Sequence, residues 1–390
     1  MKDTLLMVDM SVKQGSPAGS CVKTILQGLP QGALTCELFS SEWDGAASAP
    51  DVHWHGIKAP SKPVAWRYIV FHTRVKRAVA QWLSQRDRSR VLVQATQGQW
   101  VGADIVYAHF CHGAYLADLL KQPAWLSPRY VARVITHAFN AWRERLAFEH
   151  AKVVVAPSAG LDRELRQHYS LPASKIQVLA NPVDVTRFKR PECESRQSLQ
   201  QRLGLESGRR WLSFMALGDF ERKGLGVLLR AWAELDPESR EALGLIVIGG
   251  QPDEIASFQR LAAEMGLAAR VRFVGMQSDV RPYLWASDVF AFPSAYEIFS
   301  LAILQAAAAG LPVMVTQRLY GAEEFVEDGF NGWQVSRDVQ GVRQALLKIA
   351  TLMPEALWAM GQNAQQSVAQ YSQEAFVQKW RSLYRSLGLE

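Results

Sequence analysis

Short apolar runs alternate with helical segments along this chain. Runs that predict buried strands lie at residues 5–8, 91–93, 105–108, 176–179, 211–217, 245–250, 271–275, 289–292 and 313–316. Strong helix formers, or apolar residues at three- and four-residue steps, fill intervening stretches such as 64–83 and 301–309. This alternation predicts parallel sheets whose two faces are covered by helices.

The length of the chain bounds the number of domains. A chain of 390 residues is too long for a single hydrophobic core. We therefore expect two α/β domains of the Rossmann type, at residues 1–180 and 210–370. A polar linker over 181–209 would join them, and a last helical segment over 371–390 would follow the second domain.

The composition is that of a globular protein, with 48% hydrophobic and 21% charged residues. No apolar run approaches the ~20 residues that a membrane-spanning helix needs. The apolar core of the N-terminal stretch is too short for a secretory signal. Four cysteines are scattered without metal-ligand spacing or disulfide density, so a reducing cytoplasm is the expected location.

Charge is distributed unevenly between the two halves. Residues 1–180 hold 21 Lys and Arg against 13 Asp and Glu, whereas residues 181–390 hold 22 against 24. A basic half predicts an anionic surface or partner. The sequence contains no zinc spacing, recognition helix or RNA-binding motif. An anionic membrane surface or glycolipid therefore fits better than nucleic acid.

The segment 64–83 is a candidate for contact with such a membrane. Four cations lie between its apolar positions: Arg67, Arg74, Lys76 and Arg77. Basic residues beside aromatic rings suit a helix lying on a membrane, because charge meets lipid phosphate while the rings enter the headgroup layer. The arginine- and aromatic-rich segment 125–150 would extend this patch. An ordinary surface helix packed on its own sheet is the alternative.

Two loops of the second half carry charges in positions suited to a ligand. Glu297 lies between a predicted strand and a predicted helix, and ligands of open parallel sheets collect at the carboxyl ends of strands. Its carboxylate either faces a ligand or caps the helix. Arg222 and Lys223 follow the strand 211–217, where adjacent cations can clamp a diphosphate. A solvated basic loop is the alternative for that pair.

The first half holds two weaker signals. Gly15 and Gly19 follow the first strand, where glycine allows close backbone approach and a helix N-terminus can hold an anion. A plain strand-to-helix turn explains them equally well. His109 follows the strand 105–108, where a histidine can orient a hydroxyl or take its proton. A satisfied structural histidine is the alternative.

The stretch SAYEIFSLAILQAAAAGLPV, residues 294–313, resembles the signature of the family 4 glycosyltransferases. That signature has a Glu, a Phe-Gly-Leu-like triplet, a second Glu eight positions after the first, an Ala-rich helix and Gly-x-Pro-Val. The matching positions are Glu297, Phe299, Leu301, Ala306, Gly310, Pro312 and Val313. Ser300 stands in place of the usual Gly, and Gln305 in place of the second Glu. The loop 218–224, GDFERKG, resembles one found in the lipopolysaccharide-core glucosyltransferase branch of that family.

The resemblance implies a GT-B fold: two Rossmann-like parallel-sheet domains facing a central cleft, with the last helix returning to the first domain. It implies a retaining transfer from a UDP- or GDP-sugar, without a metal or other cofactor. The acceptor would be a glycan or lipid-linked saccharide of envelope polysaccharide or lipopolysaccharide biosynthesis. The protein would be cytoplasmic, with peripheral attachment to the inner face of the plasma membrane through its basic half.

Roles follow residue by residue from the resemblance and the charges. Arg222 and Lys223 would meet the departing diphosphate, helped by backbone amides near Ser300 and Leu301. Glu297 would hold sugar hydroxyls. The further donor contacts would come from Gly19, Gly218, Phe299 and Gln305. His109, placed by the resemblance at the cleft, would act on the acceptor.

The two departures from the signature leave a rival open. Gln305 can bond a ribose hydroxyl but without charge, a loss of ~1 kcal/mol. A chain altered at these positions could be a non-catalytic partner in a glycan-assembly complex. A basic nucleic-acid-binding protein is the more remote alternative.

Overall fold

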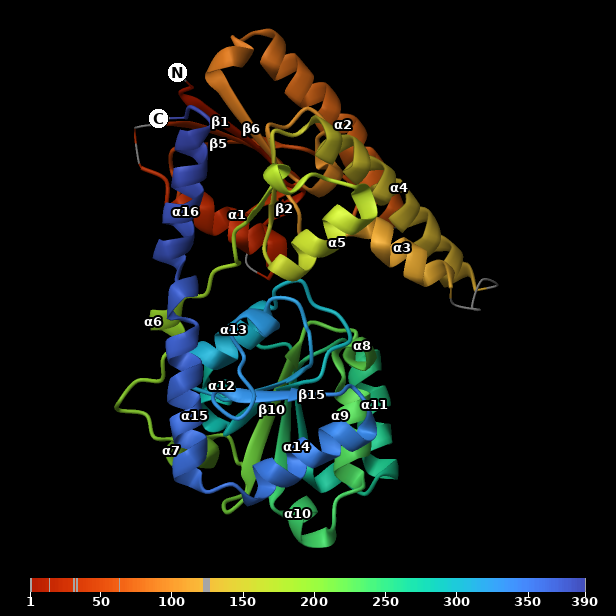
Figure 1. The fold of residues 1–390 in the computed structure, drawn as a ribbon, viewed down its shortest axis with the longest axis vertical. Coiled ribbons are helices and arrows are strands. Elements are labelled where there is room, and N and C mark those ends of the chain that lie inside the picture. The colour runs from red at the N-terminus through yellow and green to blue at the C-terminus, as the bar shows by residue number, and fades with distance from the viewer. Residues whose placement is uncertain are drawn as a thin grey trace. The chain divides into compact units, whose positions relative to one another are not determined.

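A computed structural model gives the fold of this protein and describes residues 2–13, 15–30, 32, 34–62, 64–121 and 127–389. The chain forms two compact units (Figure 1). Unit 1 comprises residues 1–181 and 373–390, and unit 2 comprises residues 182–372. Residues 125 and 126 of the segment 125–150 lie outside the described residues.

The main sheet of unit 1 is parallel throughout, in the order β5-β3-β1-β6-β7-β8-β9. Its strands are β1 (Thr4–Val8), β3 (Thr35–Ser40), β5 (Val52–Gly56), β6 (Val91–Thr96), β7 (Ile105–Tyr107), β8 (Val153–Ala156) and β9 (Ile176–Val178). A short parallel pair, β2 (Ser11–Val12) and β4 (Glu42–Trp43), lies beside it. The central strand β1 is buried from Leu5 to Val8, as its apolar run predicts.

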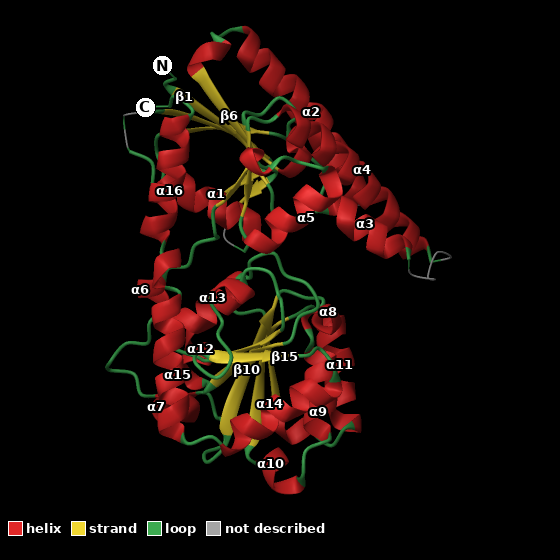
Figure 2. Ribbon diagram, in the orientation of Figure 1, coloured by secondary structure: helices red, strands yellow, loops and turns green. Residues whose placement is uncertain are grey.

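Helices cover both faces of this sheet (Figure 2). They are α1 (Pro17–Gln27), α2 (Val64–Ser84), α3 (His112–Leu120), α4 (Pro128–His150), α5 (Ala159–Tyr169) and α16 (Gln373–Ser386). Helix α16 comes from the far end of the chain and packs closely on unit 1. The Trp380 ring is fully buried, 4.9 Å from the Tyr107 ring, and the Tyr384 hydroxyl donates to Gln94 Oε1 at 2.7 Å.

Unit 2 holds a second parallel sheet, in the order β12-β11-β10-β13-β14-β15. Its strands are β10 (Arg210–Ala216), β11 (Leu243–Gly249), β12 (Val271–Gly275), β13 (Val289–Phe292), β14 (Val313–Thr316) and β15 (Gly332–Val335). Its helices are α6 (Val185–Phe188), α7 (Arg196–Arg202), α8 (Phe220–Lys223), α9 (Leu225–Ala233), α10 (Pro237–Glu241), α11 (Pro252–Glu264), α12 (Arg281–Ala286), α13 (Leu301–Ala308), α14 (Val339–Thr351) and α15 (Pro354–Ser367).

The prediction of two parallel-sheet α/β domains is confirmed. The expected linker over 181–209 differs from what the structure shows, since α6 and α7 lie within it and belong to unit 2. These helices are anchored by buried side chains that interrupt an otherwise polar sequence, Phe188 and Leu199. Among the described helices, none is long and apolar enough to cross a membrane.

Candidate active site

The charged residues predicted in unit 2 meet at the carboxyl ends of two neighbouring strands. Strands β10 and β13 pair in parallel, and each is followed by a loop that leads into a helix. The loop after β10 leads to α8, which ends in Arg222 and Lys223. The loop after β13 contains Glu297 and leads to α13. Carboxyl edges of parallel sheets are where ligands bind in open α/β folds.

A close backbone approach locks these two loops together. Gly224 ends α8 with φ +94°, and a Cβ on it would lie 2.2 Å from the Pro293 carbonyl oxygen. Only glycine fits there. The Ala295 N–H donates to the Arg222 carbonyl at 2.8 Å, and Arg337 donates from Nε to the Pro293 carbonyl at 3.1 Å. The bracing by Arg337 has no signal in the local sequence, because that residue lies far along the chain.

Lys223 and Glu297 form an ion pair. Their side chains are only 18% and 10% exposed, so the pair is largely shielded from water. The Ser294 hydroxyl donates to Glu297 Oε1 at 2.8 Å, and Ser294 is fully buried. The Lys223 ammonium also lies 5.5 Å from the centre of the Phe292 ring, within the range of a cation–π contact. The pair is therefore held in position by its surroundings, and Ser294 is a positioning residue that the sequence pattern did not reveal.

Arg222 reaches the same loop. Its Nη1 donates to the Tyr296 carbonyl at 2.8 Å, and its Nε donates to the Asp219 carboxylate. Asp219 has φ +62°, an uncommon conformation for a residue other than glycine and one often found at functional sites. The side chain of Arg222 is 34% exposed, more than that of Lys223. The structure thus brings Arg222, Lys223 and Glu297 together.

The amino end of α13 completes this edge. Ser300 precedes the helix with extended backbone, and its hydroxyl makes no capping bond within the described residues. The first N–H groups of a helix lack helical acceptors, so this terminus can bind an anion. Leu301 begins the helix and Gln305 lies one turn further, both partly exposed.

Two other residues predicted to contact a donor lie in the same region. Gly218 is partly buried in the loop after β10, and a Cβ there would approach Glu254 Oε2 at 3.4 Å. The Phe299 side chain is 4% exposed and packs edge-on against the Tyr371 ring at 5.2 Å. Packing accounts for that aromatic side chain, which leaves only the Phe299 backbone for a ligand.

Two of the predicted site residues, Gly19 and His109, belong to unit 1. Gly19 is buried in α1, and a Cβ on it would lie 1.9 Å from the Ser11 carbonyl oxygen, so helix packing requires glycine there. The centre of the His109 ring lies 3.9 Å from that of the Tyr107 ring, with the two planes tilted by 51°, and burial lowers the pKa of His109 to about 3. A neutral His109 ring can donate a hydrogen bond from one nitrogen and accept one at the other, and it carries no charge at pH 7.

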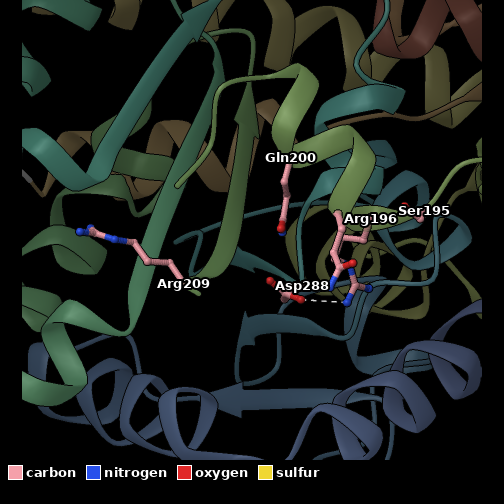
Figure 3. A pocket seen from close by; sticks show the side chains of 6 residues that line it. Ser195, Arg196, Gln200, Arg209 and Asp288 are labelled. Carbon is pink, nitrogen blue, oxygen red and sulfur yellow. Dashed lines mark hydrogen bonds and ion pairs between the residues drawn. The ribbon is translucent and has the colours of Figure 1, made fainter. Parts of the chain in front are cut away.

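A cavity of about 390 Å³ lies at the opposite edge of the unit 2 sheet (Figure 3). It is lined by Ser195, Arg196, Gln197, Gln200, Arg209 and Asp288. Asp288 immediately precedes β13, and it accepts from Arg196 Nη1 and the Trp211 N–H, both at 2.8 Å. Its carboxylate therefore fastens α7 to the amino ends of the strands, which is a structural role.

No group of three or more His, Cys, Asp or Glu is placed to hold a metal ion in the part of the chain that the structure describes. The β10–β13 edge presents fixed cations and helix amides. Such groups suit phosphate oxygens, and a shielded carboxylate beside them suits hydroxyl groups.

Two family models match this chain. One, described as glycosyl transferases group 1, matches residues 212–351, and the other, described as glycosyltransferase family 4, matches residues 18–187. Together they cover most of the chain and include both the β10–β13 edge and the surroundings of His109.

Proteins that are similar to this chain in sequence are named as glycosyltransferases. The chain is 34% identical over 174 residues to the lipopolysaccharide core biosynthesis glycosyltransferase LpsE of Rhizobium meliloti (strain 1021), which covers 44% of this chain and 49% of that protein. It is 29% identical over 253 residues to the D-inositol 3-phosphate glycosyltransferase of Corynebacterium jeikeium (strain K411), covering 63% and 59%. The chain thus matches about half the length of the first and less than two thirds of the second.

Solved structures share the fold over nearly the full chain. WaaG, a glycosyltransferase involved in lipopolysaccharide biosynthesis, gives a TM-score of 0.79 at 19% identity, covering 97% of this chain and 99% of that one. Anabaena Alr3699/HepE in complex with UDP and glucose gives 0.72 at 21% identity, covering 98% and 99%. At these identities the likeness concerns the fold alone.

Proposed function

The chain belongs to family 4 of the glycosyltransferases, and from that premise we propose that it transfers a sugar from a nucleotide sugar to a glycan or lipid-linked acceptor. The observation that carries this proposal is the meeting of Arg222, Lys223 and Glu297 at the carboxyl edge of β10 and β13. Two cations and a carboxylate at one strand edge suit a diphosphate joined to a sugar.

The proposed chemistry is electrostatic. Departure of a nucleoside diphosphate from the sugar leaves an oxocarbenium-like ring and a growing negative charge on the phosphate oxygen. Lys223, Arg222 and the first amides of α13 would stabilise that charge, because fixed dipoles and cations need no reorganisation during the reaction. Glu297 would hold sugar hydroxyls, and Lys223 would exchange its contact with Glu297 for one with phosphate.

The resemblance favours retention of configuration, with the leaving phosphate taking the proton of the acceptor hydroxyl. No metal is part of this proposal, so turnover should persist in EDTA. UDP and GDP are the donor nucleotides to test first. UDP is bound in a structure of the same fold, which supports it as the first choice.

The class of acceptor is proposed from the relatives. LpsE is named for lipopolysaccharide core biosynthesis, and a second group of relatives is named for D-inositol 3-phosphate. An envelope saccharide, free or lipid-linked, is the acceptor that we propose, since the basic first half of this chain suits work near an anionic surface.

Membrane contact is a further part of the proposal. Trp66 and Ile69 on α2, and Ile135 and Trp142 on α4, are each 37–56% exposed, although they are large and apolar. The two helices contact each other, and arginines lie among these side chains. Apolar rings among cations are the pattern of a surface that meets anionic lipid.

Vesicle sedimentation tests this contact. We expect vesicles containing phosphatidylglycerol to retain the protein at low salt, and vesicles of phosphatidylcholine alone to retain less. Trp142→Ser should weaken retention, whereas Trp358→Ser, at a residue 59% exposed in unit 2, should not. Equal retention by both kinds of vesicle would refute the membrane proposal.

Turnover tests the transfer itself. Release of nucleoside diphosphate is measured from a panel of UDP- and GDP-sugars with an envelope glycolipid extract as acceptor. Lys223→Met should lower turnover at least ~100-fold, since about 2.7 kcal/mol of charge stabilisation would be lost. Lys189→Met, at an exposed lysine of unit 2, is the matched control and should leave turnover unchanged.

The non-catalytic alternative rests on Ser300 and Gln305, the two departures from the family signature. The same panel separates the two functions. Nucleotide binding without turnover on any donor would favour a partner subunit. Absence of both binding and turnover would contradict the enzyme proposal.

A further inference from the structure

Unit 1 contains a cavity of about 300 Å³ at the carboxyl ends of its central strands. Asp9 follows β1, Gln97 follows β6 and His109 lies just beyond β7. Helix α2 adds His72 to the wall, and helix α4 adds Asn140 and Glu144, which lie one turn apart. Its size is at the lower end of the range for small-molecule pockets, about 300–1,000 Å³.

Unpaired polar atoms concentrate in this wall. Among the described residues, fifteen buried side-chain atoms have no hydrogen-bond partner, and six of them belong to residues that line this one cavity. The six are Asp9 Oδ2, His72 Nδ1, Gln97 Oε1, His109 Nε2, Asn140 Nδ2 and Glu144 Oε1. A buried polar atom left unpaired costs about 1–3 kcal/mol. Six such atoms around one space indicate a polar ligand that pairs with them.

The surrounding structure holds these groups in place. Glu144 Oε2 accepts from the His112 N–H at 2.9 Å and from the Tyr169 hydroxyl at 2.6 Å, which fixes the carboxyl group. Its Oε1 lies 3.8 Å from His112 Nε2 and makes no hydrogen bond. Asp9 Oδ1 likewise accepts from the Ser11 N–H at 2.8 Å. Gln97 has φ +53°, a left-handed backbone conformation that is strained in residues other than glycine. The surrounding structure therefore holds Gln97 in this conformation.

The wall is close to neutral. Burial raises the pKa of Glu144 to about 8, so this group is mostly protonated at pH 7. Burial lowers the pKa of His72 and of His109 to about 3, so both rings are neutral. Asp9, whose pKa is raised by burial to about 6, is the carboxylate that carries charge at pH 7.

None of the described residues that line the cavity is a lysine or an arginine. Arg143 is near enough to His72 to lower the pKa of that ring further, but its Nε donates to the Gly98 carbonyl at 3.2 Å and it does not line the cavity. A phosphate or carboxylate placed here would meet the Asp9 carboxylate and no Lys or Arg side chain of the wall. Hydroxyl groups, which both donate and accept, match a wall of neutral donors and acceptors beside one carboxylate.

We propose that this cavity binds one uncharged polyhydroxylated ring, a hexose or a cyclitol, and discriminates against its phosphorylated form. The inference rests on the proposed function, in which this ring would be the acceptor, and it narrows the acceptor to one that presents an unphosphorylated ring to unit 1. Preference for an unphosphorylated ring would distinguish this chain from relatives named for an inositol phosphate.

Saturation-transfer NMR of the full-length protein tests the proposal. The probes are methyl glucoside, methyl galactoside, methyl mannoside and myo-inositol, each compared with glucose 6-phosphate, galactose 6-phosphate, mannose 6-phosphate or inositol 1-phosphate. At least one neutral ring should bind, and its phosphate should bind at least ~10-fold more weakly. Absence of binding by every neutral ring, or equal or tighter binding of the phosphates, would overturn the proposal.

Asn140→Leu supplies the sharper comparison. Leucine nearly preserves the shape of asparagine but removes an amide whose Nδ2 has no partner, so the fold should be as stable as before or more stable. Ring binding should fall at least ~10-fold, and Glu144→Gln, which keeps a neutral donor, should retain it. Ala138→Leu, at an exposed position on the same helix, is the control. Wild-type ring binding by Asn140→Leu would overturn the proposal.

Calorimetry with UDP and GDP on the same samples keeps the two claims apart. Nucleotide binding without ring binding refutes the cavity proposal and leaves the transferase proposal standing. Ring binding without any nucleotide binding supports the cavity and contradicts the transferase.

Discussion

Ser294 shows how one buried hydroxyl can set the position of a functional carboxylate. Its Oγ bonds Glu297 Oε1, and Thr316 in turn donates to the Ser294 carbonyl at 2.7 Å. A hydrogen bond to a charged group contributes about 1.5–3 kcal/mol. The position of Glu297 therefore depends on Ser294 of the same loop and, through the Ser294 carbonyl, on Thr316 of β14.

Ser294→Ala should lower kcat about tenfold, because Glu297 would lose the bond that orients it toward the sugar. KM for the donor should change less, since the cations that meet the diphosphate remain. Ser213→Ala, which removes a buried hydroxyl inside β10, is the matched control. Steady-state kinetics decide the matter: an unchanged kcat for Ser294→Ala would rule out its positioning role.

Buried and partly buried histidines make unit 1 sensitive to acid. Burial lowers the pKa of His72, His109 and His112 to about 3 and that of His137 to about 4. An unfolded histidine binds its proton below pH ~6.5, so stability present above that pH is lost as the pH falls toward the folded pKa. The raised pKa values of Asp9 and Glu144 act in the opposite direction, but four histidines outnumber two carboxyl groups.

The free energy of unfolding of unit 1 should therefore fall between pH 6.5 and pH 5. His72→Leu should reduce this slope by about 1.4 kcal/mol per pH unit, the value for one proton. His150→Leu, at an exposed position, should leave it unchanged. Urea unfolding followed by hydrogen exchange of unit 1 amides gives the slope, and identical slopes for His72→Leu and wild type would contradict this account.

Strands that bury a continuous apolar run could be predicted from the sequence. Strands whose buried polar residues depend on hydrogen bonds from a neighbouring strand could not. Strands β1, β10, β13 and β14 follow directly from their runs. Strand β3 was missed because it buries Glu37, whose carboxylate is bonded by His53 and His55. Those histidines lie on β5, an edge strand too exposed to show an apolar pattern.

The same limit on prediction from the sequence applies to the candidate site. A signature within one continuous stretch predicted Glu297, and the spacing of strand and cations predicted Arg222 and Lys223. The bracing by Arg337 and the shared wall of the unit 1 cavity depend on tertiary contacts between distant segments. No local pattern could show which polar atoms the fold leaves unpaired.

Gly224 is the test at the level of elements, because it joins the loop of β10 to that of β13. In Gly224→Ala the alanine would have to adopt a positive φ, and its Cβ would lie 2.2 Å from the Pro293 carbonyl oxygen. Gly329→Ala shares the positive φ, at +78°, but its Cβ meets nothing within 4 Å. Overpacking adds about 1–3 kcal/mol, so thermal unfolding should show Gly224→Ala less stable than Gly329→Ala by that amount.

Turnover should fall with Gly224→Ala and persist with Gly329→Ala, because only the first change moves Lys223 relative to Glu297. Equal stability and equal turnover of the two variants would show that the close approach of the loops does not matter.

At the scale of the whole molecule, the chain begins and ends in unit 1. Helix α16 supplies buried aromatic side chains to a core that comes mostly from residues before 181. Trp380→Ala should destabilise unit 1 by about 3–5 kcal/mol through loss of apolar contact and the cavity left behind. Trp358→Ala, at an exposed residue of unit 2, should cost far less. Comparable stability of the two variants in chemical denaturation would contradict the structural role of α16.

The central claim is that a nucleoside diphosphate binds at the carboxyl edge of β10 and β13 through Arg222 and Lys223. Isothermal titration of wild type, Lys223→Met and Lys189→Met with UDP and with GDP tests it directly. The account predicts that one nucleotide binds wild type and Lys189→Met alike, and binds Lys223→Met at least ~10-fold more weakly. Absence of binding to the wild type, or equal affinity for all three proteins, would contradict it.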